Sequence, residues 1–256
     1  MIFMWDVMLY DELLSKIDFY KVHPEYLPFI GNKYNEYKIL HIGESHYIGQ
    51  KNDPLAADKY PVTYFENWWT NRCSDLYNEY GGWYNTRQVI GNYLSGDRHK
   101  GHSIFSETIK VFDKVYLGID NVQINYEESQ NYHYFAFMNF FQMPSLYEGV
   151  KYWDSILDSA NKLGNKQLAF DMWEMAAQIS SKVLDNVIEI LKPKVVIFTS
   201  ESAKGAYGKY GKYPAEPNVK YSTHPGCSWW NRPMKRYNGL TGKQELERQL
   251  FELRNK

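Results

Sequence analysis

The stretch from Lys38 to Tyr47, KILHIGESHY, constrains this chain more than any other. Its first half is apolar and branched, and Gly43 ends that run. A short apolar run that stops at a glycine and a polar cluster is typical of a buried strand with functional side chains at its carboxyl end. In open α/β sheets, ligands bind at that edge. We therefore expect a site around the polar residues that follow, which are Glu44, Ser45, His46 and Tyr47.

Three further segments have the composition of buried strands, namely 134–141, 194–199 and 218–222. Apolar residues at helical spacing lie between these strands, most clearly at 103–113 and 168–192, and a charged amphipathic helix is expected at 242–254 after the last strand. Apolar strands that alternate with helices predict a mostly parallel sheet covered on both faces. The expected fold is therefore α/β, a three-layer α/β/α arrangement with a central four-stranded sheet.

The chain has 256 residues, of which 44% are apolar and 23% are charged. These values are ordinary for a globular soluble protein. Without internal repeats or low-complexity linkers, residues 1–256 are expected to form a single domain. An aromatic-rich insertion at about 48–102 follows the first strand, with helices expected at 63–79 and 86–94. Ordinary connections have about 4–6 residues, so an insertion of this length is typical of a lid or a binding loop.

Charge and cysteine content exclude several classes of function. The formal net charge is −1, so no global basic field attracts nucleic acid. Cys73 and Cys227 are too few for a disulfide framework or a four-cysteine metal site. We expect no metal and no other cofactor. No apolar run approaches the roughly 20 residues that span a bilayer, and Met1–Tyr10 lacks the basic start of a signal peptide. The chain is therefore expected in the cytoplasm, away from membranes.

Polar residues also follow the other strands. Asn139 lies near the end of the second strand, and His224 follows the fourth. Because the carboxyl ends of parallel strands share one edge, these residues are expected to meet the Glu44–Tyr47 cluster there.

Three features of the sequence resemble the uracil-DNA glycosylase superfamily. In chain order they are 43–47, Asn139 and 224–227. Gly43-Glu44-Ser45-His46-Tyr47 is similar to the first motif of that family, which reads Gly-Gln-Asp-Pro-Tyr-His in one branch and Gly-Glu-Ala-Pro-Gly in another. His224-Pro225-Gly226-Cys227 resembles its second motif, His-Pro-Ser-Pro, and Asn139 resembles its base-reading asparagine. The resemblance covers roughly residues 36–235. Ser45 stands where one branch has its water-activating aspartate, and His46 replaces the motif proline.

The resemblance implies hydrolysis of an N-glycosidic bond, at uracil or a modified base, after the base leaves the stack. His224 would donate to the oxyanion that develops on the base, and Glu44 or His46 would position or deprotonate water. Asn139 would read the edge of the base. The other implied base contacts are Gly43, Ser45, Tyr47, Phe140, Pro225 and Gly226. The implied DNA contacts are Trp229, Trp230, Arg232, Lys235 and Arg236. The implied partner is nucleic acid, with DNA favoured, or a nucleotide.

Two other functions remain open. A member of the fold that binds nucleic acid or a nucleotide without turnover is favoured by Ser45 and by the near-zero net charge. An esterase-like hydrolase is suggested by Gly43-Glu44-Ser45-His46 alone, and it leaves Asn139 unexplained. The structural alternatives are that Glu44 caps a helix, that the histidines are hydrogen-bonded parts of the core, and that Trp229 and Trp230 pack.

Overall fold

The computed structural model describes residues 2–48, 58–97, 100–120, 123–147, 150–213 and 218–255, with the backbone alone at 2–7 and 100. Within these residues, one five-stranded sheet has the order β1-β3-β2-β4-β5. Its strands are β1 (Phe29–Ile30), β2 (Ile39–Tyr47), β3 (Phe135–Ser145), β4 (Val195–Phe198) and β5 (Asn218–Tyr221). The four longer strands run parallel, whereas β1 pairs antiparallel with β3. The α/β class is confirmed. The expected sheet of four strands is corrected to five, since the two residues of β1 are too few to show a period.

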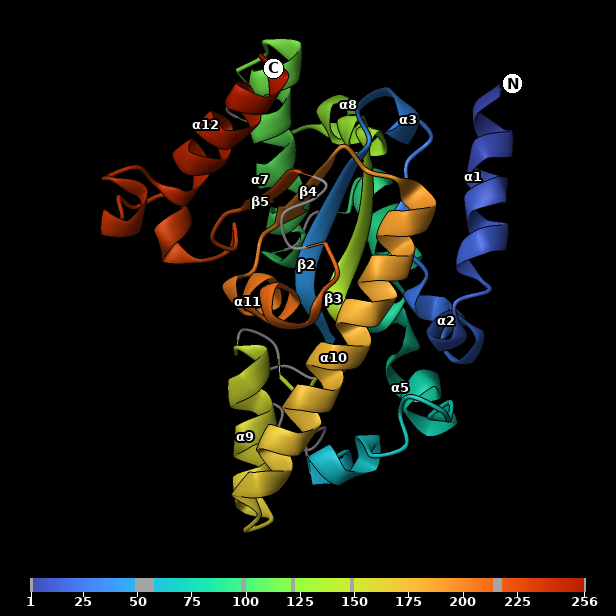
Figure 1. The fold of residues 1–256 in the computed structure, drawn as a ribbon. Coiled ribbons are helices and arrows are strands. Elements are labelled where there is room, and N and C mark those ends of the chain that lie inside the picture. The colour runs from blue at the N-terminus through green and yellow to red at the C-terminus, as the bar shows by residue number, and fades with distance from the viewer. Residues whose placement is uncertain are drawn as a thin grey trace.

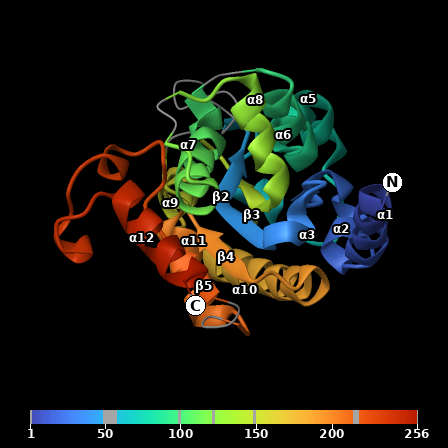
Figure 2. The same ribbon diagram turned by 90° about the horizontal axis from the view of Figure 1, so that it is seen from above.

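Helices cover both faces of this sheet (Figures 1 and 2). On one face lie α9 (Tyr152–Lys162), α10 (Lys166–Leu191) and α11 (Glu201–Tyr210), with α1 (Ile2–Leu14) beside α10. On the other lie α6 (Thr86–Leu94), α7 (Ser103–Phe112), α8 (Tyr126–Ser129) and α12 (Gly242–Arg254). Other helices in the described part of the chain are α2 (Asp18–Val22), α3 (Tyr34–Tyr37) and α5 (Ser74–Tyr84). The short helical turns are η1 (Pro24–Tyr26), η2 (Val62–Phe65), η3 (Lys100–His102), η4 (Asp113–Leu117), η5 (Gln130–Tyr134), η6 (Ser228–Trp230) and η7 (Lys235–Tyr237).

The central strand β2 has buried side chains on both faces, because it is paired with β3 and β4 and covered by helices on each side. Successive side chains of a strand point to opposite faces. Leu40 and Ile42 accordingly join the core beneath α10, and Ile39 joins the core beneath α7 and α12. Burial on both faces is why β2 begins as a nearly continuous apolar run.

The expected helices at 86–94 and 242–254 are confirmed, and those at 103–113 and 168–192 match α7 and α10 within two residues. The helix expected at 63–79 is wrong, because η2 and α5 are separated by turns. The side chain of Trp68 bonds to the carbonyl of Gln142, and its own carbonyl faces His23 Nε2 at 2.8 Å. At Trp68, these long-range contacts take the place of the i to i−4 hydrogen bonds of a helix.

The expected insertion at 48–102 includes residues 49–57 and 98–99, which lie outside the described ranges. Its described part packs against the sheet edge, with Trp68 almost fully buried and Trp83 about half exposed. Across the described ranges, no helix is both long and apolar enough for a bilayer crossing.

Two glycines provide a stability test of this packing. A Cβ atom on Gly31 would lie 2.1 Å from the backbone oxygen of His133, so β1 and the chain before β3 approach too closely for a side chain. In the middle of α6, Gly91 has no atom within 4 Å of that position. We expect Gly31→Ala to lower the free energy of unfolding by about 2 kcal/mol or more. Gly91→Ala should raise it by about 0.5–1 kcal/mol. Urea unfolding of both variants checks this, and equal effects would contradict the packing of β1.

Candidate functional site

The loop after β5 fixes the orientation of His224. Its Nδ1 accepts a hydrogen bond from the backbone N–H of Gly226 at 3.0 Å, and its carbonyl accepts from Cys227 N at 2.9 Å. Because Nδ1 is an acceptor, the neutral ring carries its proton on Nε2. Burial lowers the pKa of His224, which favours this neutral form near pH 7. The side chain therefore offers one N–H donor and no charge.

Asn139 lies opposite Gly43 in the β2–β3 register. A Cβ atom on Gly43 would lie 2.2 Å from Asn139 Oδ1 and 3.1 Å from the ring of Phe137. Only glycine at position 43 leaves room for this amide. Among the described residues, no hydrogen bond engages the Asn139 side chain, so its donor and its acceptor are available to a ligand.

The structure places Asn139, within β3, and His224, after β5, on the α7 side of the sheet, near the level at which β4 and β5 end. The expectation that Asn139 lies near the end of its strand is wrong, because β3 continues to Ser145. On β2, between Asn139 and His224, lie Gly43 and the buried His41, whose pKa is lowered first by burial and second by repulsion from the protonated form of His224. Ser103, the first residue of α7, is also close, because a Cβ atom on Gly226 would lie 3.3 Å from its Oγ and 3.1 Å from His224 Nδ1.

Glu44 is bound in a different place, between two helix N-termini. Its Oε1 accepts from the backbone N–H of Tyr152 at 2.9 Å, and its Oε2 accepts from Ser200 Oγ at 2.7 Å. Tyr152 begins α9, and Ser200 is the N-cap of α11. A carboxylate at this position complements the positive ends of both helix dipoles. The structure thus gives Glu44 the capping contacts that the sequence left as the alternative interpretation.

His46 anchors the insertion to β2. The imidazole is buried, its Nε2 lies 3.0 Å from Thr86 Oγ1, and it also bonds to the backbone of Trp83. Burial lowers the pKa of His46 to about 3, partly offset by the bond to Trp83. The ring also packs edge-on against Tyr26, with centroids 5.0 Å apart. His46 is therefore a neutral packing residue at the α5–α6 junction.

The other residues that the resemblance implied as base contacts differ in their exposure and in their contacts. Ser45 is half-buried, and within the described ranges its hydroxyl has no hydrogen-bond partner. Tyr47 packs edge-on against Trp83 at 6.3 Å. Pro225 is buried and Gly226 is exposed. Phe140 is corrected, because it is fully buried in the core on the α10 side, on the face of β3 opposite Asn139.

The loop that the resemblance implied for DNA contact is also only partly available. Trp229 is 51% exposed, and Arg232 and Lys235 are exposed without an ion pair to any described residue. Trp230 is corrected, because it is fully buried and its Nε1 donates to Glu107 on α7 at 3.0 Å. Arg236 donates to Glu201 and to the hydroxyl of Tyr221.

Sequence reasoning missed three residues of this region, His41, Thr199 and Ser103. His41 precedes Gly43 by two residues, so the two-residue period of a strand places it on the same face. That period was a signal for His41. Thr199 follows β4 at the level of Gly43, and nothing in its local sequence marks it.

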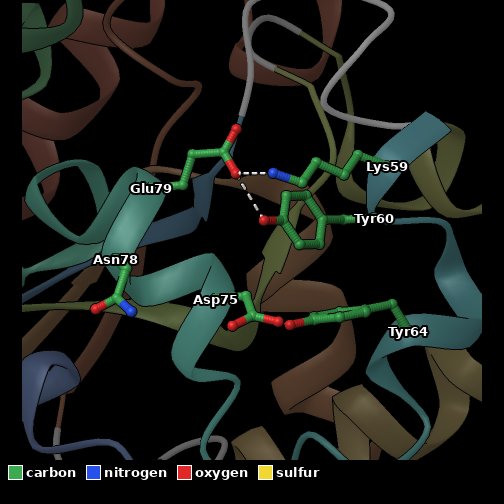
Figure 3. A pocket seen from close by; sticks show the side chains of 6 residues that line it. All are labelled: Lys59, Tyr60, Tyr64, Asp75, Asn78 and Glu79. Carbon is green, nitrogen blue, oxygen red and sulfur yellow. Dashed lines mark hydrogen bonds and ion pairs between the residues drawn. The ribbon is translucent and has the colours of Figure 1, made fainter.

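A pocket of about 570 Å³ lies elsewhere, between α5 and residues 59–64 (Figure 3). Glu79 holds Lys59 and the hydroxyl of Tyr60 within it, and Tyr64, Asp75 and Asn78 complete the lining. Its lining of exposed acidic residues and more buried tyrosines shares no residue with the Asn139–His224 region. The candidate site is therefore the α7 side of the sheet around His224 and Asn139, whose side-chain amide is unengaged among the described residues.

Within the described parts of the chain, no group of three or more His, Cys, Asp or Glu residues could hold a metal ion. A scan against protein-family models and searches of curated proteins and of solved structures give no match for this chain.

The capping role of Glu44 can be measured as stability. Glu44→Gln removes the negative charge. The amide NH₂ group of the glutamine then faces either the N–H of Tyr152 or the hydroxyl of Ser200, which are both donors to Glu44. We expect the free energy of unfolding to fall by about 1–2 kcal/mol. Glu66→Gln, at an exposed carboxylate, is the matched control and should change it by less than about 0.5 kcal/mol. Equal stability of the two variants in urea would contradict the capping role.

Proposed function

We propose that the chain binds a nucleobase at the carboxyl edge of β2 and β3, and hydrolyses its N-glycosidic bond in the manner of the uracil-DNA glycosylase superfamily. The observation that carries this proposal is the bond from Gly226 N–H to His224 Nδ1. A neutral imidazole held in this way has a single donor, Nε2–H, for a carbonyl oxygen of the base. When the glycosidic bond breaks, that oxygen gains negative charge, and a fixed donor stabilises it more than it stabilises the bound substrate.

Asn139 supports the proposal through its unengaged amide, which can pair with an adjacent C=O and N–H on the base edge. The parallel β3-β2-β4-β5 arrangement is compatible with the implied fold. Trp229, Arg232 and Lys235 are the exposed residues proposed for nucleic-acid contact. Phosphate contacts of this kind position a substrate without reading its sequence.

The water-handling step proposed for Glu44 and His46 is reassigned. Glu44 uses both carboxylate oxygens on helix ends, and His46 is buried between Tyr26 and Thr86. The main catalytic contribution is therefore the stabilisation of negative charge on the leaving base by His224. Once the base has departed, the sugar carries cation-like character and reacts with water that Ser45 can orient by its hydroxyl. Serine at neutral pH is no general base, so slow turnover is expected.

Binding without turnover is the second candidate, favoured by the engagement of Glu44 and His46. It predicts salt-dependent binding of nucleic acid without bond cleavage. The esterase-like interpretation lacks support at Ser45, because no imidazole among the described residues hydrogen-bonds to its hydroxyl.

A cleavage assay separates these candidates. A single-stranded oligonucleotide that contains deoxyuridine should yield alkali-labile sites with the unaltered chain. His224→Ala should lower the single-turnover rate by about 100-fold or more, because the oxyanion loses its donor. Salt-sensitive binding without alkali-labile sites would identify the binding protein instead. Absence of both would overturn the proposal.

Gly43→Ala tests the position of the Asn139 amide. The added methyl group must displace that amide, since it would lie 2.2 Å from Oδ1. We expect at least about a 10-fold loss of affinity for the oligonucleotide, comparable to the loss of one well-placed hydrogen bond. Gly91→Ala serves as the control and should bind as the unaltered chain does. Normal affinity of a folded Gly43→Ala protein would exclude Asn139 from the site.

A further inference from the structure

His41 is a buried titratable group that the proposed function leaves unused. It lies on β2, two residues before Gly43 and on the same face, and its side chain is fully buried. The rings of Phe135 and Phe137 lie 6.4 and 5.2 Å from its own. Despite these apolar neighbours, both ring nitrogens are engaged. Nδ1 lies 2.8 Å from the hydroxyl of Tyr132 on η5, and Nε2 lies 3.1 Å from Thr199 Oγ1.

The direction of each hydrogen bond in this chain can be assigned. Thr199 Oγ1 donates its single proton to the carbonyl of Ile42 at 3.1 Å. It must therefore accept from His41, which places a proton on Nε2. Nδ1 is then the acceptor of the neutral ring, and Tyr132 is its donor. His41 is held as the Nε2–H tautomer from both sides.

A second proton on His41 has no acceptor in this arrangement. It would meet the hydroxyl of Tyr132, whose own proton has no other acceptor among the described residues. The charged form would also be buried. Burial first, and repulsion from the protonated form of His224 second, lower the pKa of His41 to about 3. The titratable groups that act on His41 are Tyr132 from η5 and His224 from the loop after β5, and Tyr93 on α6 acts in turn on Tyr132.

His41 and His224 thus form a pair of neighbouring imidazoles with unequal surroundings. We propose that the Tyr132–His41–Thr199 chain makes His41 a positioning residue, which directs any proton taken up by the pair to His224. The added proton then lies on His224, toward the ligand. It does not lie on His41, inside the core. The inference rests on the proposed function only for what His224 binds. The assignment of the proton stands on the hydrogen bonds.

Long-range ¹H–¹⁵N NMR spectra of the full chain test this between about pH 8 and about pH 5. In the unaltered protein, His41 should keep an unprotonated Nδ1 throughout, and His224 should titrate alone. Tyr132→Phe keeps the ring and removes the hydroxyl that donates to His41 Nδ1, so the neutral form of His41 loses one hydrogen bond and its protonation becomes less unfavourable. The two imidazoles should then titrate as a coupled pair, with the midpoint of His224 lowered by on the order of half a pH unit or more.

Tyr34→Phe is the matched control, because it removes a buried hydroxyl that donates to the carbonyl of Leu191 in the core on the other face of the sheet. It should leave both titration curves unchanged. Identical His224 curves in Tyr132→Phe and Tyr34→Phe would overturn the proposal, as would titration of His41 before His224 in the unaltered chain. A purely structural role would lower stability without moving the midpoint of His224. Thr199→Val is the second variant, should Tyr132→Phe fail to fold. It removes the acceptor of Nε2–H and should produce a mixture of His41 tautomers, whereas a single unchanged tautomer would overturn the assignment.

These spectra need no ligand. If only the proposed function is wrong, the chain neither cleaves nor binds the oligonucleotide, and the NMR result still holds. Failure of the present inference would appear in the spectra alone.

Discussion

The pairing of β2 with strands on both sides is the constraint on which the rest of the structure depends. As the central strand, β2 must send alternate side chains into two different cores. Its polar residues connect it to the elements around it: His41 to η5 and the end of β4, Glu44 to α9 and α11, and His46 to the α5–α6 junction. The same strand therefore organises the core and the edge at which a ligand is proposed to bind.

This arrangement has a chemical consequence. Gly43 and Glu44 are neighbours in sequence, yet they serve different faces of the sheet. The acid is used to cap helices, and the α7 side is left with an amide, hydroxyls and a neutral imidazole. Such a site stabilises charge on a leaving group better than it activates water. That balance is why the leaving base carries the proposed mechanism, and why binding without turnover is its natural competitor.

The sequence predicted the elements whose signal is long and periodic. The four parallel strands and α6, α7, α10 and α12 follow from apolar spacing. Parallel strand polarity predicted that Asn139 and His224 lie toward the same end of the strands, but not which face of the sheet they occupy, nor that β3 continues past Asn139. Long-range contacts decided what the sequence could not: β1 exists through pairing alone, Trp68 interrupts an expected helix, and Trp230 is buried against Glu107. The roles of Glu44 and His46 depend on partners 108 and 40 residues away, which no local pattern reveals.

The most direct measurement is an NMR titration of the chain with a deoxyuridine-containing single strand. If the ligand binds at the sheet edge, shifts should concentrate on the side-chain amide of Asn139 and the imidazole of His224, with smaller shifts at Trp229. Shifts that cluster instead at Lys59, Tyr64 and Asp75, in the pocket of Figure 3, would contradict binding at the sheet edge. In that case the sheet edge would be a structural joint, and the binding site would lie on the insertion.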